Sequence, residues 1–171
     1  MRKIYGIICF LLFWISHSTA QEIKGIRIGD QVWMTKNLNL STPGSDFYNH
    51  DEALEKRYGR LYTWEAAQDA CPTGWHLPSR RDWEELINFL GGENTAGKRL
   101  SIGGDTGFNA MLGGFANLSK CVLLDLYGAY WSSDPYNDTQ AWYYYLNSKQ
   151  SILTKTYCSM NYKLSVRCIK N

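Results

Sequence analysis

The strongest hydrophobic pattern in the chain is an unbroken apolar run near its start, at residues 7–15. Two basic residues, Arg2 and Lys3, precede the run, and a Ser-Thr-Ala stretch follows it at residues 18–20. A basic start, an apolar centre and a small-residue cleavage site are typical of a secretory signal peptide. We therefore predict that residues 1–20 are removed on export. The run is shorter than the roughly 20 residues that span a bilayer, which disfavours the alternative of an uncleaved anchor.

Shorter apolar stretches predict a hairpin at the start of the mature domain. Residues 25–28 and 31–34 are both apolar-rich, and a Gly-Asp pair separates them. A two-residue turn with glycine between two such stretches is typical of an antiparallel hairpin. Residues 39–58 contain proline, glycine and many polar side chains, so we predict a long loop there. A short extended stretch at residues 59–62 follows it.

Two helices are predicted next. Thr63 can cap a short helix over residues 64–68. Ser79 begins a clearer helix, because Ser79 and Asp82 resemble a capping box. Four apolar residues of this helix have the i, i+3, i+4, i+7 spacing of a core-facing stripe; they are Trp83, Leu86, Ile87 and Leu90.

The second half of the chain has the pattern of strands. Residues 127–133, 141–147 and 163–170 are rich in β-branched and aromatic side chains, which favours extended structure. Two early helices followed by a loop-rich antiparallel half predict an α+β fold. The length of the mature part, residues 21–171, predicts a single domain.

The net charge of the mature domain disfavours polyanionic partners. The full chain has 18 basic and 16 acidic residues, and the first twenty residues hold two of the basic ones and no acidic ones. The mature domain is therefore formally neutral, with no overall charge to attract nucleic acid or an anionic membrane. No later segment is apolar and long enough to span a membrane.

Cysteine use agrees with export. Four cysteines remain after cleavage, at positions 71, 121, 158 and 168. An even number in an exported chain favours two disulfides, with three possible pairings, and free buried thiols are the alternative. The chain has no Cys-x-x-Cys motif and no close histidine pair, so the spacing does not indicate zinc.

An ordered series of short motifs runs through nearly the whole mature domain, at residues 29–34, 59–67, 70–78, 83–86, 107–110, 130–133 and 165–168. Together these motifs resemble the Fibrobacter succinogenes major paralogous domain, a family of exported bacterial domains. The resemblance implies a C-type lectin-like fold with two helices, small antiparallel sheets and long loops. It also implies a disulfide between Cys71 and Cys168, and leaves Cys121 and Cys158 as the second pair. It brings no settled biochemical activity with it.

The aromatic run after Ala141 is the candidate binding strand. On a strand, Trp142 and Tyr144 share one face and Tyr143 and Tyr145 share the other. We expect one pair in the core and the other exposed, where it can stack on sugar rings or contact a protein; a second packed layer is the alternative. The candidate binding residues are Trp131, Tyr136, Trp142, Tyr143, Tyr144 and Tyr145.

Oxygen donors cluster just before this run. Asp134, Asn137 and Asp138 are candidate Ca²⁺ ligands, although an ordinary polar turn accounts for them too. Lectins of the related fold combine such a loop with a Trp-Asn-Asp strand, which this chain lacks, so no cofactor is predicted. His76 is a candidate base or ligand. We expect it to be structural, because no second histidine lies near it in the sequence.

These observations favour a secreted or surface-exposed binding module for a glycan or a protein. The chain has no nucleotide-binding loop, nucleophile elbow or metalloprotease motif, so catalytic activity is not predicted. One alternative is an enzyme related to the formylglycine-generating sulfatase-modifying group, with Cys121 and Cys158, or His76, in its pocket. Another is a structural adhesin of the cell envelope. The expected location is the periplasm, the outer cell surface or the medium.

Overall fold

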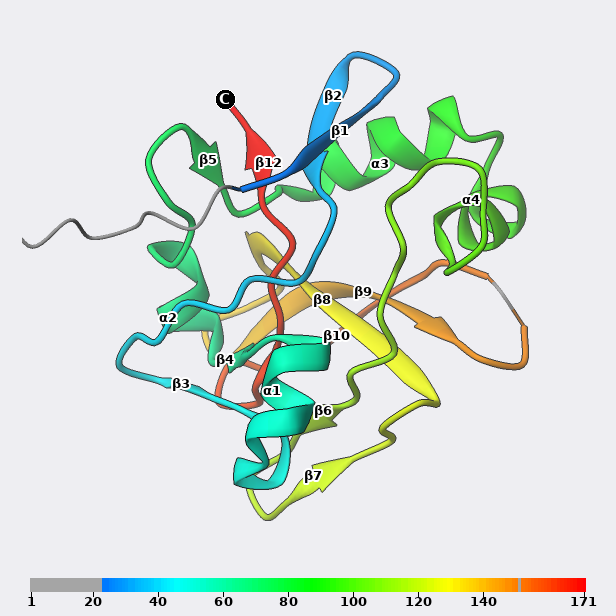
Figure 1. Cartoon of the computed structure of the whole chain (residues 1–171). Helices are drawn as coiled ribbons and strands as arrows, with labels where there is room; N and C mark the ends of the chain where they lie inside the picture. Colours follow the sequence, from blue (N-terminus) through cyan, green and yellow to red (C-terminus); the bar gives the residue numbers. More distant parts are fainter. Residues whose placement is uncertain (1–22, 151) are drawn as a thin grey trace, which may run out of the picture.

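The structure, a computed structural model, describes residues 23–150 and 152–171 of the chain. The predicted signal peptide, residues 1–20, lies outside the described residues. The described part is an α+β fold with four α-helices and three sheets, which confirms the predicted class (Figure 1). None of its helices has the length and apolar character needed to cross a bilayer.

The first sheet joins the beginning and the end of the domain. Its strand order is β1 (Gly25–Ile28), β2 (Gln31–Met34), β12 (Ile169–Lys170) and β5 (Trp75–His76), as Figure 1 shows. The predicted hairpin is confirmed, with β1 antiparallel to β2. Gly29 turns the chain with a φ of 61°, a conformation that glycine adopts without steric cost.

The second sheet forms the centre of the molecule. Its strand order is β10 (Thr154–Ser159), β9 (Gln140–Asn147), β8 (Tyr127–Pro135), β11 (Leu164–Ser165), β4 (Leu61–Tyr62) and β3 (Ser45–Asp46). Strands β8, β9 and β10 form an antiparallel meander, and β11 runs parallel to β8. The strands predicted over residues 127–133 and 141–147 are confirmed. The third sheet pairs β6 (Phe115–Ala116) with β7 (Cys121–Val122).

The single strand predicted over residues 163–170 is wrong. The segment forms β11 and β12, which belong to different sheets. Between them, the carbonyl oxygens of Val166 and Cys168 accept hydrogen bonds from the backbone of Leu38 and Met34. The chain crosses here from one sheet to the other, and the side chain of Arg167 is fully buried at the crossing.

Both predicted helices are confirmed, as α2 (Trp64–Gln68) and α3 (Arg80–Phe89). The Thr63 side chain caps α2, and Ser79 and Asp82 form the expected capping box on α3. Two further α-helices were not predicted, α1 (Glu52–Tyr58) and α4 (Glu93–Leu100), together with a 3-10 turn η1 (Tyr48–His50).

The prediction of a loop over residues 39–58 is therefore wrong. Asp51 begins α1 by accepting the backbone N–H groups of Ala53 and Leu54. This is the geometry of an N-cap, which satisfies donors that a helix start leaves unpaired. The helix buries only Tyr58, so its sequence has no apolar stripe by which it could be recognised.

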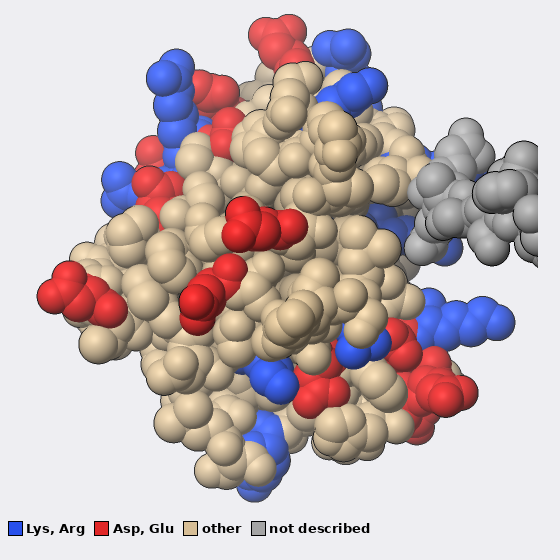
Figure 2. Space-filling view, turned by 90° about the vertical axis from the view of Figure 1, so that its left-hand side faces the viewer, with Lys and Arg blue, Asp and Glu red and all other residues tan. Residues whose placement is uncertain are grey.

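Two apolar clusters fill the core on either side of the central sheet. The first packs α3 and α4 against the hairpin and one face of β8 and β9, and the ring centroids of Trp33 and Trp83 lie 4.7 Å apart in it. The second packs α2 against the opposite face, around Trp131 and Val166. The surface over these layers carries acidic and basic side chains interspersed with broad uncharged areas, on the face that Figure 2 shows.

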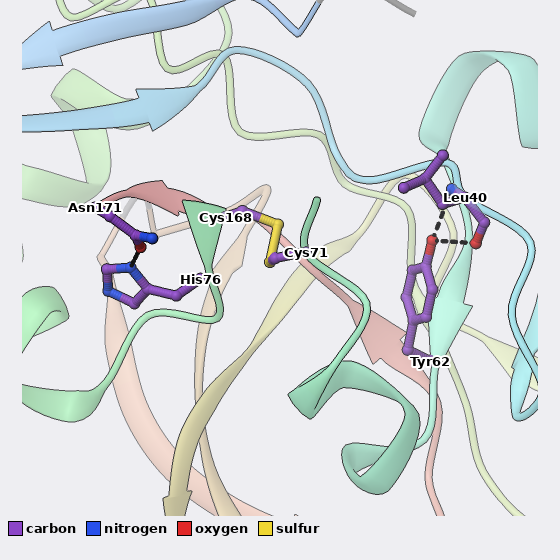
Figure 3. Close-up of a disulfide and its surroundings, with 6 residues drawn as sticks. All are labelled: Leu40, Tyr62, Cys71, His76, Cys168 and Asn171. Carbon is purple, nitrogen blue, oxygen red and sulfur yellow. Dashed lines mark hydrogen bonds between the residues drawn. A yellow bond between two sulfur atoms is a disulfide. The ribbon is translucent and has the colours of Figure 1, made fainter. Parts of the chain in front are cut away.

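One disulfide is formed in the described chain, between Cys71 and Cys168, whose Cα atoms lie 6.0 Å apart (Figure 3). This pairing confirms the one that the family resemblance implied. Cys121 and Cys158 are free, so the predicted second disulfide is wrong. The two thiols belong to different sheets, Cys121 to β7 and Cys158 to β10.

Candidate functional site

The structure places two of the predicted binding residues in the core. Tyr144 and Trp131 are both 0% exposed. The ring of Tyr144 stacks on Trp83 with 5.0 Å between centroids, and the Trp131 indole donates to the carbonyl oxygen of Tyr62 at 2.7 Å. Their assignment to a binding surface is therefore wrong, because a fully buried side chain cannot contact a ligand.

Tyr143 and Tyr145 form the second packed layer that was the alternative to exposure. Both are half-buried against the cluster around Trp131. The centroid of Tyr143 lies 6.1 Å from that of Trp131, and Tyr145 stacks on Tyr127 at 5.4 Å. Burial raises the pKa of the Tyr143 hydroxyl. Neither ring is presented freely to solvent.

The aromatic surface lies instead at one end of β9 and β10, where Tyr136, Trp142 and Tyr157 meet. We call these three residues the aromatic patch. Tyr136 stacks on Tyr157 with 3.8 Å between centroids, and Trp142 lies edge-to-face with both, at 5.0 and 5.7 Å. Tyr136 and Tyr157 are 44% and 41% exposed, and Trp142 is half-buried. The patch is therefore both ordered and accessible.

Strand register explains why these rings meet. Trp142 and Tyr157 are directly opposite each other in the β9–β10 ladder, and residues opposite each other share a face of the sheet. Tyr136 follows β8 in the turn toward β9. Tyr157 was not predicted, because no strand was predicted over the residues of β10. The available signal in the sequence was the Thr-Lys-Thr-Tyr stretch at residues 154–157, whose threonines and tyrosine favour a strand.

Charged groups surround the aromatic patch. The Arg80 guanidinium carbon lies 5.4 Å and the Lys155 Nζ 5.6 Å from the centroid of Trp142. Lys155 is in turn paired with Glu84 at 2.9 Å. Arg80 and Glu84 project from α3 and Lys155 from β10. The neighbouring Tyr157 hydroxyl raises the pKa of Tyr136.

Two of the three predicted calcium ligands, Asp134 and Asn137, accept hydrogen bonds from nearby backbone N–H groups. Asp134 Oδ2 accepts the backbone N–H of Arg80 at 2.6 Å, at the first turn of α3. Asn137 Oδ1 accepts the backbone N–H groups of Thr139 and Gln140 and so closes the turn. Asp138 is exposed on the same turn. Across residues 23–150 and 152–171, no three His, Cys, Asp or Glu side chains are grouped to hold a metal ion.

The candidate groups for an enzyme lie on different strands. His76 is on β5, where its Nδ1 lies 2.7 Å from Asn171 Oδ1 (Figure 3) and its Nε2 lies 3.6 Å from Asp82. Cys121 is on β7 and accepts the backbone N–H of Asn49. Cys158 is on β10, and burial raises the pKa of its thiol to about 12. The three belong to three different sheets.

Comparison with known proteins gives one match. The model of the Fibrobacter succinogenes major domain matches residues 26–170, which is nearly all of the described chain. No curated protein and no solved structure matches. The chain therefore belongs to the Fibrobacter succinogenes major domain family.

Proposed function

We propose that this member of the Fibrobacter succinogenes major domain family is an extracytoplasmic binding module that recognises a glycan through the aromatic patch. One observation carries the proposal. Tyr136, Trp142 and Tyr157 form a single accessible aromatic cluster, and Arg80, Lys155 and Glu84 lie around it.

The chemistry of such a surface suits a sugar. A pyranose ring presents C–H groups on its faces, which pack on aromatic rings, and hydroxyl groups at its rim. Aromatic side chains supply large contact areas, and tyrosine adds a polar handle. Charged donors and acceptors make stronger hydrogen bonds than neutral ones, so the Lys155–Glu84 pair and Arg80 can orient the hydroxyl groups.

Location outside the cytoplasm is supported by the Cys71–Cys168 disulfide. Disulfides persist in oxidising compartments and are rare in the cytosol. The signal-peptide pattern of residues 1–20 points in the same direction.

A C-type lectin-like fold is part of the proposal. The support is that β1 and β12 share a sheet, so the two ends of the domain meet there. A disulfide also ties the chain just after α2 to the end of the domain. The disulfide is the one that the family resemblance implies.

A glycan array screened with the mature protein, residues 21–171, tests the function. We expect binding to at least one glycan, and titration calorimetry then compares Trp142→Ala and Tyr157→Ala with the unmodified protein. Each substitution should weaken binding about fivefold or more, if a ring stacked on a sugar contributes as much as the roughly 1–3 kcal/mol of a ring stacked on a nucleic-acid base. The matched control is Phe89→Ala, an aromatic side chain that is 58% exposed on α3 outside the patch.

The thermal midpoints of the variants should remain close to that of the unmodified protein, which separates loss of binding from loss of folding. Binding that survives Trp142→Ala and Tyr157→Ala unchanged would remove the patch from the proposal. If no glycan on the array binds the protein, the proposal of glycan recognition is wrong.

Protein recognition by strand addition is a second candidate, favoured by the position of β10. This strand is the outermost in its sheet, and an outer edge has unpaired backbone groups that can bind an extended segment. Hydrogen exchange distinguishes the two candidates. A protein strand should slow exchange of amides in Thr154–Ser159, whereas a glycan on the aromatic rings should leave them unchanged.

A further inference from the structure

A groove separate from the aromatic patch is lined by residues of α1 and of the segment that follows β2. The groove has a volume of about 490 Å³. This falls within the range of about 300–1,000 Å³ that is typical of small-molecule pockets. Tyr136, Trp142 and Tyr157 are not among its lining residues, so it is separate from the aromatic patch.

The floor of the groove is mainly apolar, although the buried side chain of Asn37 also belongs to the lining. Met34 and Leu38 are buried beneath it, and Leu40, Pro72 and Met111 lie beside them. Leu40 remains 38% exposed. An aliphatic chain laid along this floor would remove apolar surface from water on both partners, which is the main source of affinity in such sites.

The rim of the groove is basic. Its four cations come from the residue before β1, the segment after β2 and the end of α1, and they are Lys24, Lys36, Lys56 and Arg57. All four are exposed, and the ion pairs found in the described chain do not include them. The one acidic residue in the lining, Glu55, is paired with Arg60.

The helix dipole of α1 accounts for only two of the four basic side chains at the rim. Lys56 and Arg57 occupy the last turn of α1, where cations complement the helix dipole. Lys24 and Lys36 lie outside any helix. Because the mature chain is formally neutral, four cations around one apolar floor are a local concentration of charge.

We propose that this groove binds an amphipathic anion, with an aliphatic chain on the apolar floor and a phosphate headgroup at the basic rim. The basic side chains at the rim would attract the headgroup, and burial of apolar surface on the floor would hold the aliphatic chain. The site is independent of the glycan function, because the two surfaces share no residues.

Isothermal titration of the mature protein with dodecyl phosphate, below its critical micelle concentration, tests the proposal. We expect saturable binding that weakens as sodium chloride is raised, since salt screens exposed charges. Dodecyl maltoside, which has the same chain without charge, and inorganic phosphate, which has the headgroup without the chain, should each bind at least tenfold more weakly. Equal binding of either one would overturn the proposal.

Charge reversal locates the site. Lys36→Glu with Lys56→Glu should weaken dodecyl phosphate binding at least tenfold. The matched control, Lys120→Glu with Lys149→Glu, reverses two exposed lysines elsewhere on the surface and should have little effect. Trp142→Ala should also bind dodecyl phosphate normally, which keeps this test distinct from the glycan test. Undiminished binding by the groove variant would show that the probe binds elsewhere.

Discussion

At the scale of single residues, Arg167 carries the largest number of long-range polar contacts. Its guanidinium donates to Asn37 Oδ1 at 2.7 Å, and to the carbonyl oxygens of Met34 at 3.0 Å and Phe108 at 2.6 Å. The guanidinium carbon also lies 4.3 Å from the Phe108 ring centroid. Burial lowers the pKa of Arg167 to about 10, so the group is still charged at neutral pH. A buried charge is tolerated here because each donor direction meets an oxygen.

We predict that Arg167→Met lowers the free energy of unfolding by about 3 kcal/mol or more, because each buried acceptor left unpaired costs about 1–3 kcal/mol. Urea unfolding measures the change as a shift in midpoint at an unchanged slope. Arg167→Lys should recover only part of the loss, since an ammonium group lacks the planar fork of five donors. A Met variant as stable as the unmodified protein would show that these contacts merely offset the cost of burying the charge.

At the scale of elements, the start of α3 links the helix to the central sheet. The Ser79–Asp82 capping box satisfies one side of the first turn. Asp134, at the end of β8, accepts the N–H of Arg80 and the hydroxyl of Ser132. A carboxylate at a helix start is also favoured by the helix dipole. Asp134 was a candidate calcium ligand from the sequence, whereas in the structure it caps α3 from another element.

We predict that Asp134→Ala destabilises the domain by about 1–2 kcal/mol, the usual cost of losing a helix cap. Thermal unfolding should show the same loss in EDTA and in millimolar calcium, because the carboxylate acts on the helix. Asp134→Asn retains an acceptor and should lose less. A midpoint that rises with calcium in the unmodified protein, and no longer rises in Asp134→Ala, would restore the calcium assignment.

Elements that combine a local turn or cap signal with an apolar pattern were predictable from the sequence. The hairpin has its Gly-Asp turn, and α2 and α3 have side-chain caps with proline or glycine beyond them. The missed α1 is short and lies on the surface, and α4 begins at Gly92 without a side-chain cap. The division of residues 163–170 between two sheets depends on contacts with Met34 and Leu38, far away in the sequence.

The candidate site was also only partly predictable from local sequence patterns. Trp142 and Tyr136 were found because aromatic side chains cluster along the chain near them. Tyr157, Arg80 and Lys155 joined them only through the register of β10 and the position of α3. Local patterns do not determine which ring of an aromatic strand faces the core, because that depends on which elements pack against each side.

At the scale of the whole molecule, one covalent bond closes most of the domain. Cys71 and Cys168 are 97 residues apart in the sequence, and the loop between them contains α3, α4 and strands β8 to β10. The hydrogen bond between Cys168 and Met34 ties the same point to the hairpin sheet. The disulfide therefore constrains the parts of the chain that form both apolar clusters.

We predict that Cys71→Ser with Cys168→Ser lowers the free energy of unfolding by about 4–5 kcal/mol, because closing a loop of this length removes much of the entropy of the unfolded chain. The thermal midpoint should fall by roughly 8–20 °C for a domain of this size. Cys121→Ser is the control, since its thiol is free and half-exposed, and it should change the midpoint little.

Mass spectrometry of the mature protein checks the covalent state on which that prediction depends. Alkylation in denaturant without reductant should modify Cys121 and Cys158 alone, and alkylation after reduction should modify all four cysteines. Protection of all four before reduction would mean that the free thiols pair after all. The control variant would then also lose a crosslink, and its stability would fall with that of the Cys71 and Cys168 variant. Agreement between thiol count and stability therefore tests whether the Cys71–Cys168 bond is the single crosslink that constrains the domain.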